Sequence, residues 1–415
     1  MYHFSKFILN NGFRIVCNED KNTALAAVNM LYGVGSKHES SGIYGIAHLF
    51  EHLMFCGSLR FPEFDARVEN FNGESNAFTS NDITNYYVVL PAYNLSEILE
   101  TEADRMQNLL LDEQKLNIQK QVVIEEFKQR YLNVPYGDLW QRIRELCYAK
   151  HPYRRQTIGT CVEDIEGITL NDARNFYNTF YCPQNAVLSI CGSINTEKVF
   201  ALCKKYFNSI PQNEAYIPQN IAPESLWTEN RCKYVTSDVP VSVLVICFQM
   251  CSRREREYYI YDLISDLLSN GKSSQFYVSL VANTKLFTEI SASVSGDDEC
   301  GLFIIMGKLS KGTLMKQAEE AVWKELKGFA TKPVSSENLQ KVKNKNEANN
   351  TFGNMKVLER SMNMAYYTNL GDTELLNTER DIYDDISANE IWAVANQTFL
   401  NSYSHTLYYM SASET

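Results

Sequence analysis

The sequence is short of basic residues and has no apolar run long enough to cross a membrane. Its 415 residues carry 39 Lys and Arg against 50 Asp and Glu, a net charge of −11. An acidic chain of this kind is repelled by phosphate backbones and by anionic membrane surfaces. No stretch reaches the ~20 uncharged apolar residues of a membrane span. Both absences argue against nucleic acid and membrane as partners.

The sequence also lacks paired cysteine motifs and an N-terminal targeting pattern. The eleven cysteines are odd in number and contain no CxxC pair. An oxidising compartment disfavours such a set, because an unpaired thiol invites mispairing. The chain opens without a basic segment followed by a long apolar run. We therefore expect a cytoplasmic protein.

What is present is an ordinary globular composition, with 45% hydrophobic and 21% charged residues. At roughly 150 residues per domain, the length predicts two or three domains. Three of the ten prolines fall in one polar stretch near the middle of the chain, where neither a helix nor a strand could run unbroken. We predict a first domain at 1–210, a linker at 211–225 and a second domain at 226–415.

The two sides of the predicted linker show the same order of expected elements. The first half predicts strands at 13–17, 25–34, 75–79 and 84–90, with helices at 43–55 and 63–71 between the second and third strands. The second half predicts strands at 232–236, 241–250, 287–294 and 301–309, with helices at 257–268 and 273–283 in the same place. Long amphipathic helices, such as 95–110, would cover one face of each sheet. The order predicts an α+β fold of two similar halves, each a mostly antiparallel sheet covered by helices; an accidental match of element order is the alternative.

The predicted helix at 43–55 contains an HxxEH motif, His48-Leu49-Phe50-Glu51-His52. This spacing places two imidazoles one helical turn apart, where both can reach one metal ion. The apolar stripe of the helix lies on another face, so the core does not require the histidines. Solvated surface histidines are the alternative. In a catalytic zinc site, Glu51 would take a proton from the attacking water.

A zinc site of this type needs a third protein ligand from elsewhere in the chain. Fifty acidic residues compete for that role, and spacing alone does not choose among them. The most suggestive segment is Val122–Phe127, because Glu125 and Glu126 stand in an apolar helical run where burying two carboxylates is costly without a neutralising partner. The alternative is that one or both point to solvent.

Several motifs together resemble the pitrilysin and insulin-degrading-enzyme superfamily of inverzincins. They are Gly33-Val34-Gly35-Ser36, the HxxEH motif, Gly73-Glu74-Ser75-Asn76-Ala77-Phe78-Thr79, Val122–Phe127 and His151-Pro152-Tyr153. The closer similarity is to short bacterial members and to the zinc-bearing subunit of mitochondrial processing peptidase. The resemblance implies one Zn²⁺ per chain held by His48, His52 and Glu126. It also implies a metalloendopeptidase whose two clam-shell-like halves close over an enclosed chamber that only unfolded peptides enter. Asn76, Ala77 and Phe78 would lie on a strand that binds the substrate backbone.

The sequence departs from the family pattern at three positions. Members often carry a Glu seven residues before the third ligand, where this chain has Gln119. Active single-chain relatives carry an Arg and a Tyr that hold the substrate carbonyl, and the matching positions are Val281 and Thr288. The resemblance therefore implies a heterodimer in which a homologous subunit without HxxEH supplies the Arg and Tyr, with a homodimer as the alternative. A second hypothesis is a non-catalytic assembly subunit of a larger complex that retains the zinc site.

Overall fold

The computed structural model describes residues 1–214, 216–218, 220–295 and 298–413. The chain forms two compact units. The first contains Met1–Gln129, Arg155–Ile221 and Asn350–Thr378; the second contains Arg130–Arg154, Ala222–Asn349 and Glu379–Thr415. The predicted linker at 211–225 includes residues 215 and 219, and the predicted second domain includes 296–297 and 414–415, all of which lie outside the described residues.

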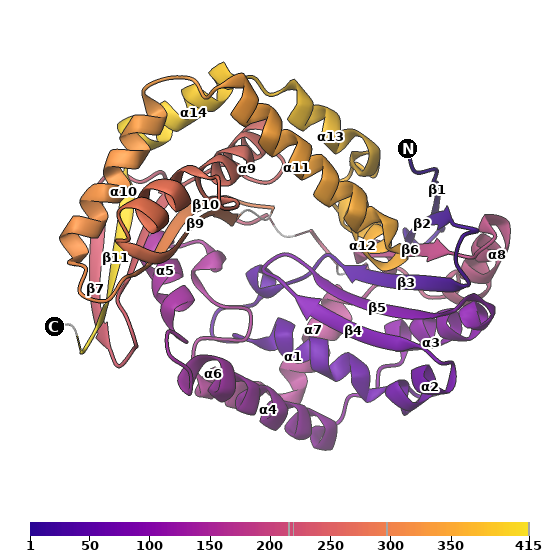
Figure 1. The fold of residues 1–415 in the computed structure, drawn as a ribbon. Helices are drawn as coiled ribbons and strands as arrows, with labels where there is room; N and C mark the ends of the chain where they lie inside the picture. The colour runs from indigo at the N-terminus through magenta and orange to yellow at the C-terminus, as the bar shows by residue number, and fades with distance from the viewer. Residues whose placement is uncertain (215, 219, 296–297, 414–415) are drawn as a thin grey trace. The chain divides into compact units, whose positions relative to one another are not determined.

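A six-stranded mixed sheet forms the centre of the first unit (Figure 1). Its strand order is β1-β2-β6-β3-β5-β4, with β2 and β6 parallel and the other neighbours antiparallel. β4 therefore lies at one edge. The strands are Ser5–Ile8 (β1), Arg14–Glu19 (β2), Leu25–Tyr32 (β3), Glu74–Thr79 (β4), Thr84–Pro91 (β5) and Ala186–Gly192 (β6).

The sheet of the second unit repeats this topology. Its order is β7-β11-β8-β10-β9, with β7 and β11 parallel and the other neighbours antiparallel. Matching β2, β6, β3, β5 and β4 to these five strands reproduces both the order and every pairing direction. The strands are Arg231–Ser237 (β7), Val243–Gln249 (β8), Phe287–Ser295 (β9), Leu302–Leu309 (β10) and Ser404–Ser411 (β11). The prediction of two similar α+β halves, each with a mostly antiparallel sheet, is confirmed.

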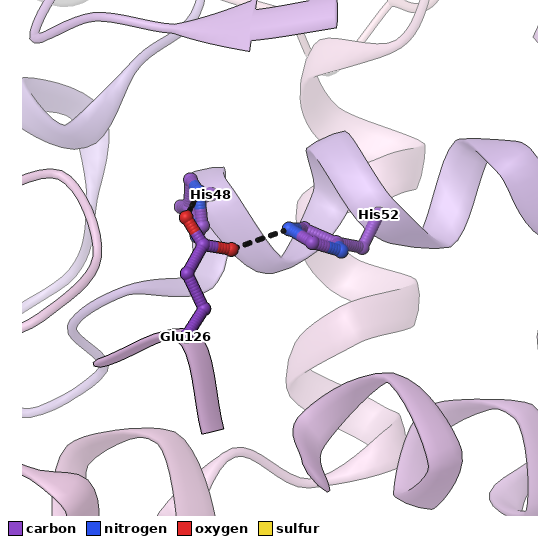
Figure 2. A group of neighbouring side chains, drawn as sticks. All are labelled: His48, His52 and Glu126. Carbon is purple, nitrogen blue, oxygen red and sulfur yellow. Dashed lines mark ion pairs between the residues drawn. The ribbon is translucent and has the colours of Figure 1, made fainter. Parts of the chain in front are cut away.

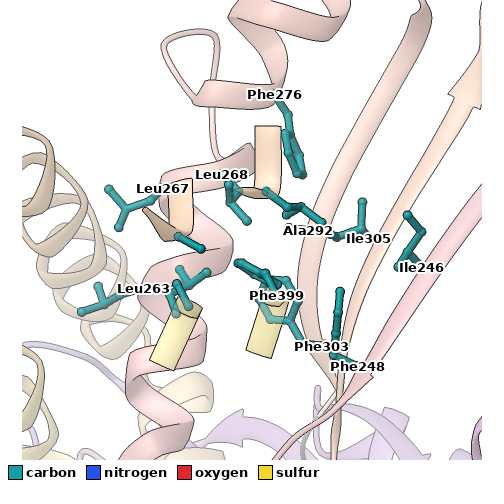
Figure 3. Close-up of a cluster of buried hydrophobic side chains, with 14 of the residues drawn as sticks. Ile246, Phe248, Leu263, Leu267, Leu268, Phe276, Ala292, Phe303, Ile305 and Phe399 are labelled. Atoms are coloured by element: carbon teal, nitrogen blue, oxygen red, sulfur yellow. The ribbon is translucent and has the colours of Figure 1, made fainter. Parts of the chain in front are cut away.

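The core of the second unit lies between its sheet and three helices. These are Arg256–Ser269 (α9), Met315–Ala330 (α10) and Ala388–Asn401 (α14). Figure 3 shows Leu263 and Leu268 of α9 beside Phe303 of β10 and Phe399 of α14, all buried. Ile260, Leu263, Ile264 and Leu267 of α9 are buried in this core at i, i+3, i+4 and i+7, which places them on one face of the helix, and burial of this face holds α9 against the sheet.

The helix covering the other face of each sheet comes from the opposite half of the sequence. In the first unit, Met364 of α12 (Val357–Leu370) packs with Val16 and Leu31. In the second unit, Ile143 of α5 (Leu139–Cys147) packs with Val245. Two segments are thus exchanged between the halves.

The exchange makes the two units discontinuous in sequence, unlike the predicted domains at 1–210 and 226–415. The prediction assumed that each amphipathic helix covers the sheet of its own half. An apolar stripe shows that a helix face is buried, but it does not identify which sheet buries it. The packing partner of α5 or α12 is therefore a property of the tertiary structure.

The remaining helices are Ile46–Leu53 (α1), Phe64–Asn70 (α2), Leu95–Gln107 (α3), Glu113–Phe127 (α4), Val162–Gly167 (α6), Leu170–Phe180 (α7), Thr196–Phe207 (α8), Ser336–Met355 (α11) and Leu375–Asp385 (α13). Three of them, α1, α2 and α3, lie within the segments predicted as helices at 43–55, 63–71 and 95–110, and the bounds of the others were not predicted individually. Among the described residues, none of the helices combines the length and the apolar composition that a bilayer crossing needs. All eleven cysteines are free thiols.

Candidate metal centre

The HxxEH motif lies on α1, which spans Ile46–Leu53 within the longer helix predicted at 43–55. The side chains of Ile46, Phe50 and Leu53 are buried in the core. The helix starts after Gly45, whose φ of +83° and close approach to the carbonyl oxygen of Ile158 leave no room for a side chain: a Cβ would lie 2.5 Å from that oxygen. Glycine is therefore required where the motif helix begins.

Side chains from two other elements hold α1 in place. Glu39 precedes the helix, and its Oε1 accepts a hydrogen bond of 3.0 Å from the backbone N–H of Ala47. Tyr86 of β5 donates from its hydroxyl to the carbonyl of Phe50 at 3.0 Å. The first contact satisfies an N–H that a helix start leaves unpaired, and the second ties the helix to the sheet. These contacts fix the direction in which the motif side chains project.

Glu126 is the carboxylate that faces the two histidines (Figure 2). It stands near the end of α4, one residue before Phe127. Its Oε2 lies 3.3 Å from Nε2 of His52, and its Oε1 lies 3.7 Å from Nε2 of His48. The neighbouring Glu125 has a side chain that is 60% exposed and pairs with Lys128. The helical pattern left both carboxylates open and the family resemblance implied Glu126; in the structure Glu126 faces the histidines and Glu125 is exposed.

The donor set of His48, His52 and Glu126 fits a zinc ion. One ligand atom from each residue lies within 4.8 Å of the others. A tetrahedral zinc ion with bonds of about 2.1 Å holds its ligand atoms roughly 3.4 Å apart, close to the 3.3 and 3.7 Å found here. His48 is 7% exposed, and the Glu126 side chain is 17% exposed. Such a shielded set of two imidazoles and one carboxylate is the type that binds catalytic zinc.

Glu51 borders this cluster and has a hydrogen-bond donor of its own. Its Oε2 lies 3.9 Å from Nε2 of His48 and accepts a hydrogen bond of 2.7 Å from the hydroxyl of Thr79. Thr79 is the last residue of β4. Thr79 ends the Gly73–Thr79 motif, and no sequence pattern predicts its contact with Glu51, because a contact between α1 and β4 depends on how the helix packs on the sheet.

Asn76, Ala77 and Phe78 lie on β4, the edge strand beside α1. Among the strands of the described residues, β4 pairs with β5 and with no other. The backbone N–H of Ala77 donates to Oδ1 of Asn76 at 2.8 Å, and the Phe78 side chain is 41% exposed. An edge strand with free backbone groups can accept an added peptide strand.

The structure shows where the three residues that depart from the family pattern lie, namely Gln119, Val281 and Thr288. The side chain of Gln119 on α4 lies beside the thiol of Cys56, whose pKa is raised by burial. In the second unit, Val281 lies in a π-helical segment, Tyr277–Asn283, and packs against the core. Thr288 is the second residue of β9 and donates to the carbonyl of Lys308. The end of a helix and the start of a strand are where the sequence predicted these two positions.

Two family models match successive parts of the chain. Residues 14–160 match the insulinase family, peptidase family M16, and residues 167–346 match the peptidase M16 inactive domain. The chain belongs to peptidase family M16. The metal cluster lies wholly within the first matched region.

Whole-length relatives support the same assignment. The chain is 32% identical over 410 residues to the zinc protease PqqE of Helicobacter pylori, covering 96% of this chain and 91% of the relative. It is 25% identical to the uncharacterised zinc protease YmxG of Bacillus subtilis, with 97% of both chains covered. A mitochondrial-processing peptidase beta subunit of Arabidopsis thaliana is 26% identical over 59% of this chain and 46% of that protein.

Solved structures agree with these sequence matches. The crystal structure of a protease from Helicobacter pylori superposes with a TM-score of 0.93 at 29% identity, covering 99% of this chain and 100% of that one. A peptidase M16 inactive domain from Pseudomonas fluorescens has the same fold, with a TM-score of 0.86, 14% identity, and coverage of 98% of this chain and 97% of that chain. Of the three relatives described above, two are named zinc proteases and the third is named as a subunit of mitochondrial-processing peptidase.

Proposed function

We propose that the protein is a zinc-dependent metalloendopeptidase that hydrolyses unfolded peptides. His48, His52 and Glu126 hold the zinc ion, and Glu51 is the general base. The observation that carries this proposal is the convergence of the three donor groups within 4.8 Å, from two helices more than seventy residues apart in the sequence. Membership of a family whose relatives are named zinc proteases supports it.

The roles of the residues follow from their positions. When bound, zinc supplies a Lewis acid that makes a coordinated water more acidic and polarises the scissile carbonyl. Glu51 accepts the proton of the attacking water and delivers it to the nitrogen of the leaving amine. The carboxylate of Glu126 offsets the positive charge of the ion beside two neutral imidazoles.

Substrate binding in this proposal uses the open edge of β4. A peptide in extended conformation would add to β4 along Asn76, Ala77 and Phe78. The main-chain hydrogen bonds that hold it would depend little on the side chains of the peptide. Such binding requires a free backbone, so we propose unfolded peptides as the substrate class. The exposed Phe78 side chain offers one apolar contact.

We further propose that the active form is a dimer. Val281 and Thr288 offer no guanidinium or phenol to hold a substrate oxyanion, and loss of such donors typically lowers rates ~100-fold or more. A homologous subunit would supply them, with a second copy of this chain as the alternative. Eleven free thiols favour a reducing compartment, consistent with a cytoplasmic location.

The proposal is tested with purified, zinc-loaded protein and a quenched-fluorescent peptide library. Glu51→Gln should bind zinc as the wild type does, while turnover falls by about 10²- to 10⁴-fold. Glu126→Ala should lose zinc, and the matched control Glu125→Ala should keep both zinc and activity, because Glu125 is exposed. Full activity of Glu51→Gln, or normal zinc content of Glu126→Ala, would overturn the assignment.

A second candidate function is a non-catalytic subunit of a larger assembly. The match of residues 167–346 to the inactive M16 domain favours it. The two candidates differ in one result, because a non-catalytic subunit would bind zinc and cleave nothing even when mixed with its partner. Zinc-dependent cleavage by the mixture that Glu51→Gln abolishes would exclude this candidate.

A further inference from the structure

Thr79 forms a hydrogen bond with the proposed general base, Glu51. Its hydroxyl donates to Oε2 of Glu51 at 2.7 Å, the usual distance of an O–H···O hydrogen bond. The two residues come from different elements, since Glu51 stands on α1 and Thr79 ends β4. The contact therefore fixes the carboxylate relative to the edge strand, and not only relative to its own helix.

The backbone that carries Thr79 is itself firmly held. Thr79 is in register with Thr84 of β5, and the tight turn that follows is closed by a hydrogen bond of 2.8 Å from the N–H of Ser80 to the carbonyl of Ile83. The hydroxyl of Ser80 accepts from the N–H groups of Asp82 and Ile83, each at 3.1 Å. Because these hydrogen bonds hold the backbone next to Thr79, its hydroxyl has little freedom to move away from Glu51.

We propose that Thr79 is a positioning residue that orients the general base Glu51. With Oε2 held by the hydroxyl 3.9 Å from Nε2 of His48, the carboxylate is oriented toward the ligand cluster when it takes the proton of the attacking water. After that transfer Oε2 still accepts from Thr79, because a protonated carboxyl keeps an acceptor oxygen. The hydrogen bond therefore persists through proton uptake and release.

The position of Thr79 on β4 links orientation of the base to substrate docking. Ala77 directs its N–H away from β5, toward Oδ1 of Asn76, and residues two apart on a strand present their backbone to the same side. The strand proposed to hold the peptide is thus the strand that aligns the base with it. This inference rests on the proposed function.

The test compares Thr79→Val, which removes the hydroxyl at nearly constant shape, with Thr79→Ser, which keeps it. Thr79→Val should lower kcat by about 10- to 100-fold, as misplacement of a catalytic group does, with little change in KM or zinc content. Thr79→Ser should restore kcat to within a few fold of the wild type. The control is Thr84→Val, which removes a neighbouring hydroxyl that donates to the carbonyl of Val34.

A second readout does not depend on turnover. A peptide hydroxamate binds catalytic zinc and gives its proton to the general base, so its affinity, measured by calorimetry, reports the orientation of Glu51. Thr79→Val should bind it about 10-fold more weakly than the wild type and Thr79→Ser. Unchanged kcat and hydroxamate affinity in Thr79→Val, or an equal kcat loss in Thr84→Val, would overturn the role of Thr79 alone. A wild type that binds neither zinc nor hydroxamate would overturn the proposed function.

Discussion

Lys120 and Lys343 hold equivalent places in the two units. Each is the eighth residue of its helix, α4 or α11. The ammonium group of Lys120 donates to the carbonyls of Glu166 and Ile168. That of Lys343 donates to the carbonyls of Asp384 and Ile386. In both units the lysine therefore binds carbonyls two residues apart at the end of a following helix, so the repeat extends from strand order to single hydrogen bonds.

Lys120→Met and Lys343→Met should each destabilise the protein. Either substitution leaves two carbonyls at a helix end without their donor, and loss of hydrogen bonds to a charged group costs roughly 2–3 kcal/mol. Urea unfolding measures the loss. Lys128→Met is the control, because Lys128 forms only an exposed pair with Glu125 and should change stability by less than about 1 kcal/mol. Equal effects of all three substitutions would refute the capping role.

Arg105 should be costly to replace alone. It is completely buried, with its guanidinium carbon 3.9 Å from the centre of the Phe64 ring and its Nη2 3.4 Å from Oε2 of Glu102. Arg105→Met leaves Glu102 buried without its ion partner, so we expect a loss of about 3–5 kcal/mol. Adding Glu102→Leu should recover a large part of it. Additive losses in urea unfolding would contradict this coupling.

Glu39 should make stability fall as the pH rises. Burial raises the pKa of this carboxyl to about 8, above the 4.5 of an exposed glutamate. The folded state thus holds a proton that the unfolded state has lost, so stability is full below pH 4.5 and declines up to about pH 8. Glu39→Gln keeps an acceptor for the N–H of Ala47 and removes the titration. It should be more stable than the wild type at pH 8 and similar to it at pH 4.5, measured by urea unfolding across pH.

Comparing the wild type with Glu39→Gln separates the pH effect of Glu39 from that of the neighbouring His38. Burial lowers the pKa of His38 to about 4 from 6.5, so His38 weakens the fold as the pH falls below 6.5 in both proteins. A difference between wild type and Glu39→Gln that grows toward acid pH would contradict the prediction.

Zinc should raise thermal stability, and a chelator should remove the gain. Binding to the folded state alone contributes about 2.7 kcal/mol at a free zinc concentration 100 times Kd. Differential scanning fluorimetry with and without zinc measures the shift in Tm. His52→Ala should abolish the shift, while His3→Ala, at an exposed position near the N-terminus, should keep it. A zinc-induced shift that survives in His52→Ala would place the ion elsewhere.

Much of the fold could be predicted from local pattern. The strand expected at 84–90 spans Thr84–Pro91, and the helix expected at 257–268 spans Arg256–Ser269. Alternation and helical periodicity report burial of one face, and both are properties of neighbouring residues. Helix boundaries were predicted less accurately than helix positions. The helix that carries the HxxEH motif starts three residues later than expected, because Gly45 and Glu39 set where it begins.

The sequence by itself determined the order of elements, the repeat and the pairing of His48 with His52, because each depends on spacing along one segment. The helical pattern left Glu125 and Glu126 open and the family resemblance implied Glu126, but only the tertiary structure shows Glu126 facing the histidines. Tertiary structure alone decided that Thr79 holds Glu51 and that α5 and α12 cover sheets of the opposite halves. Those outcomes depend on how helices rotate and pack against distant elements. Contacts between residues far apart in the chain produce no periodic pattern in the sequence, so they cannot be predicted from periodicity.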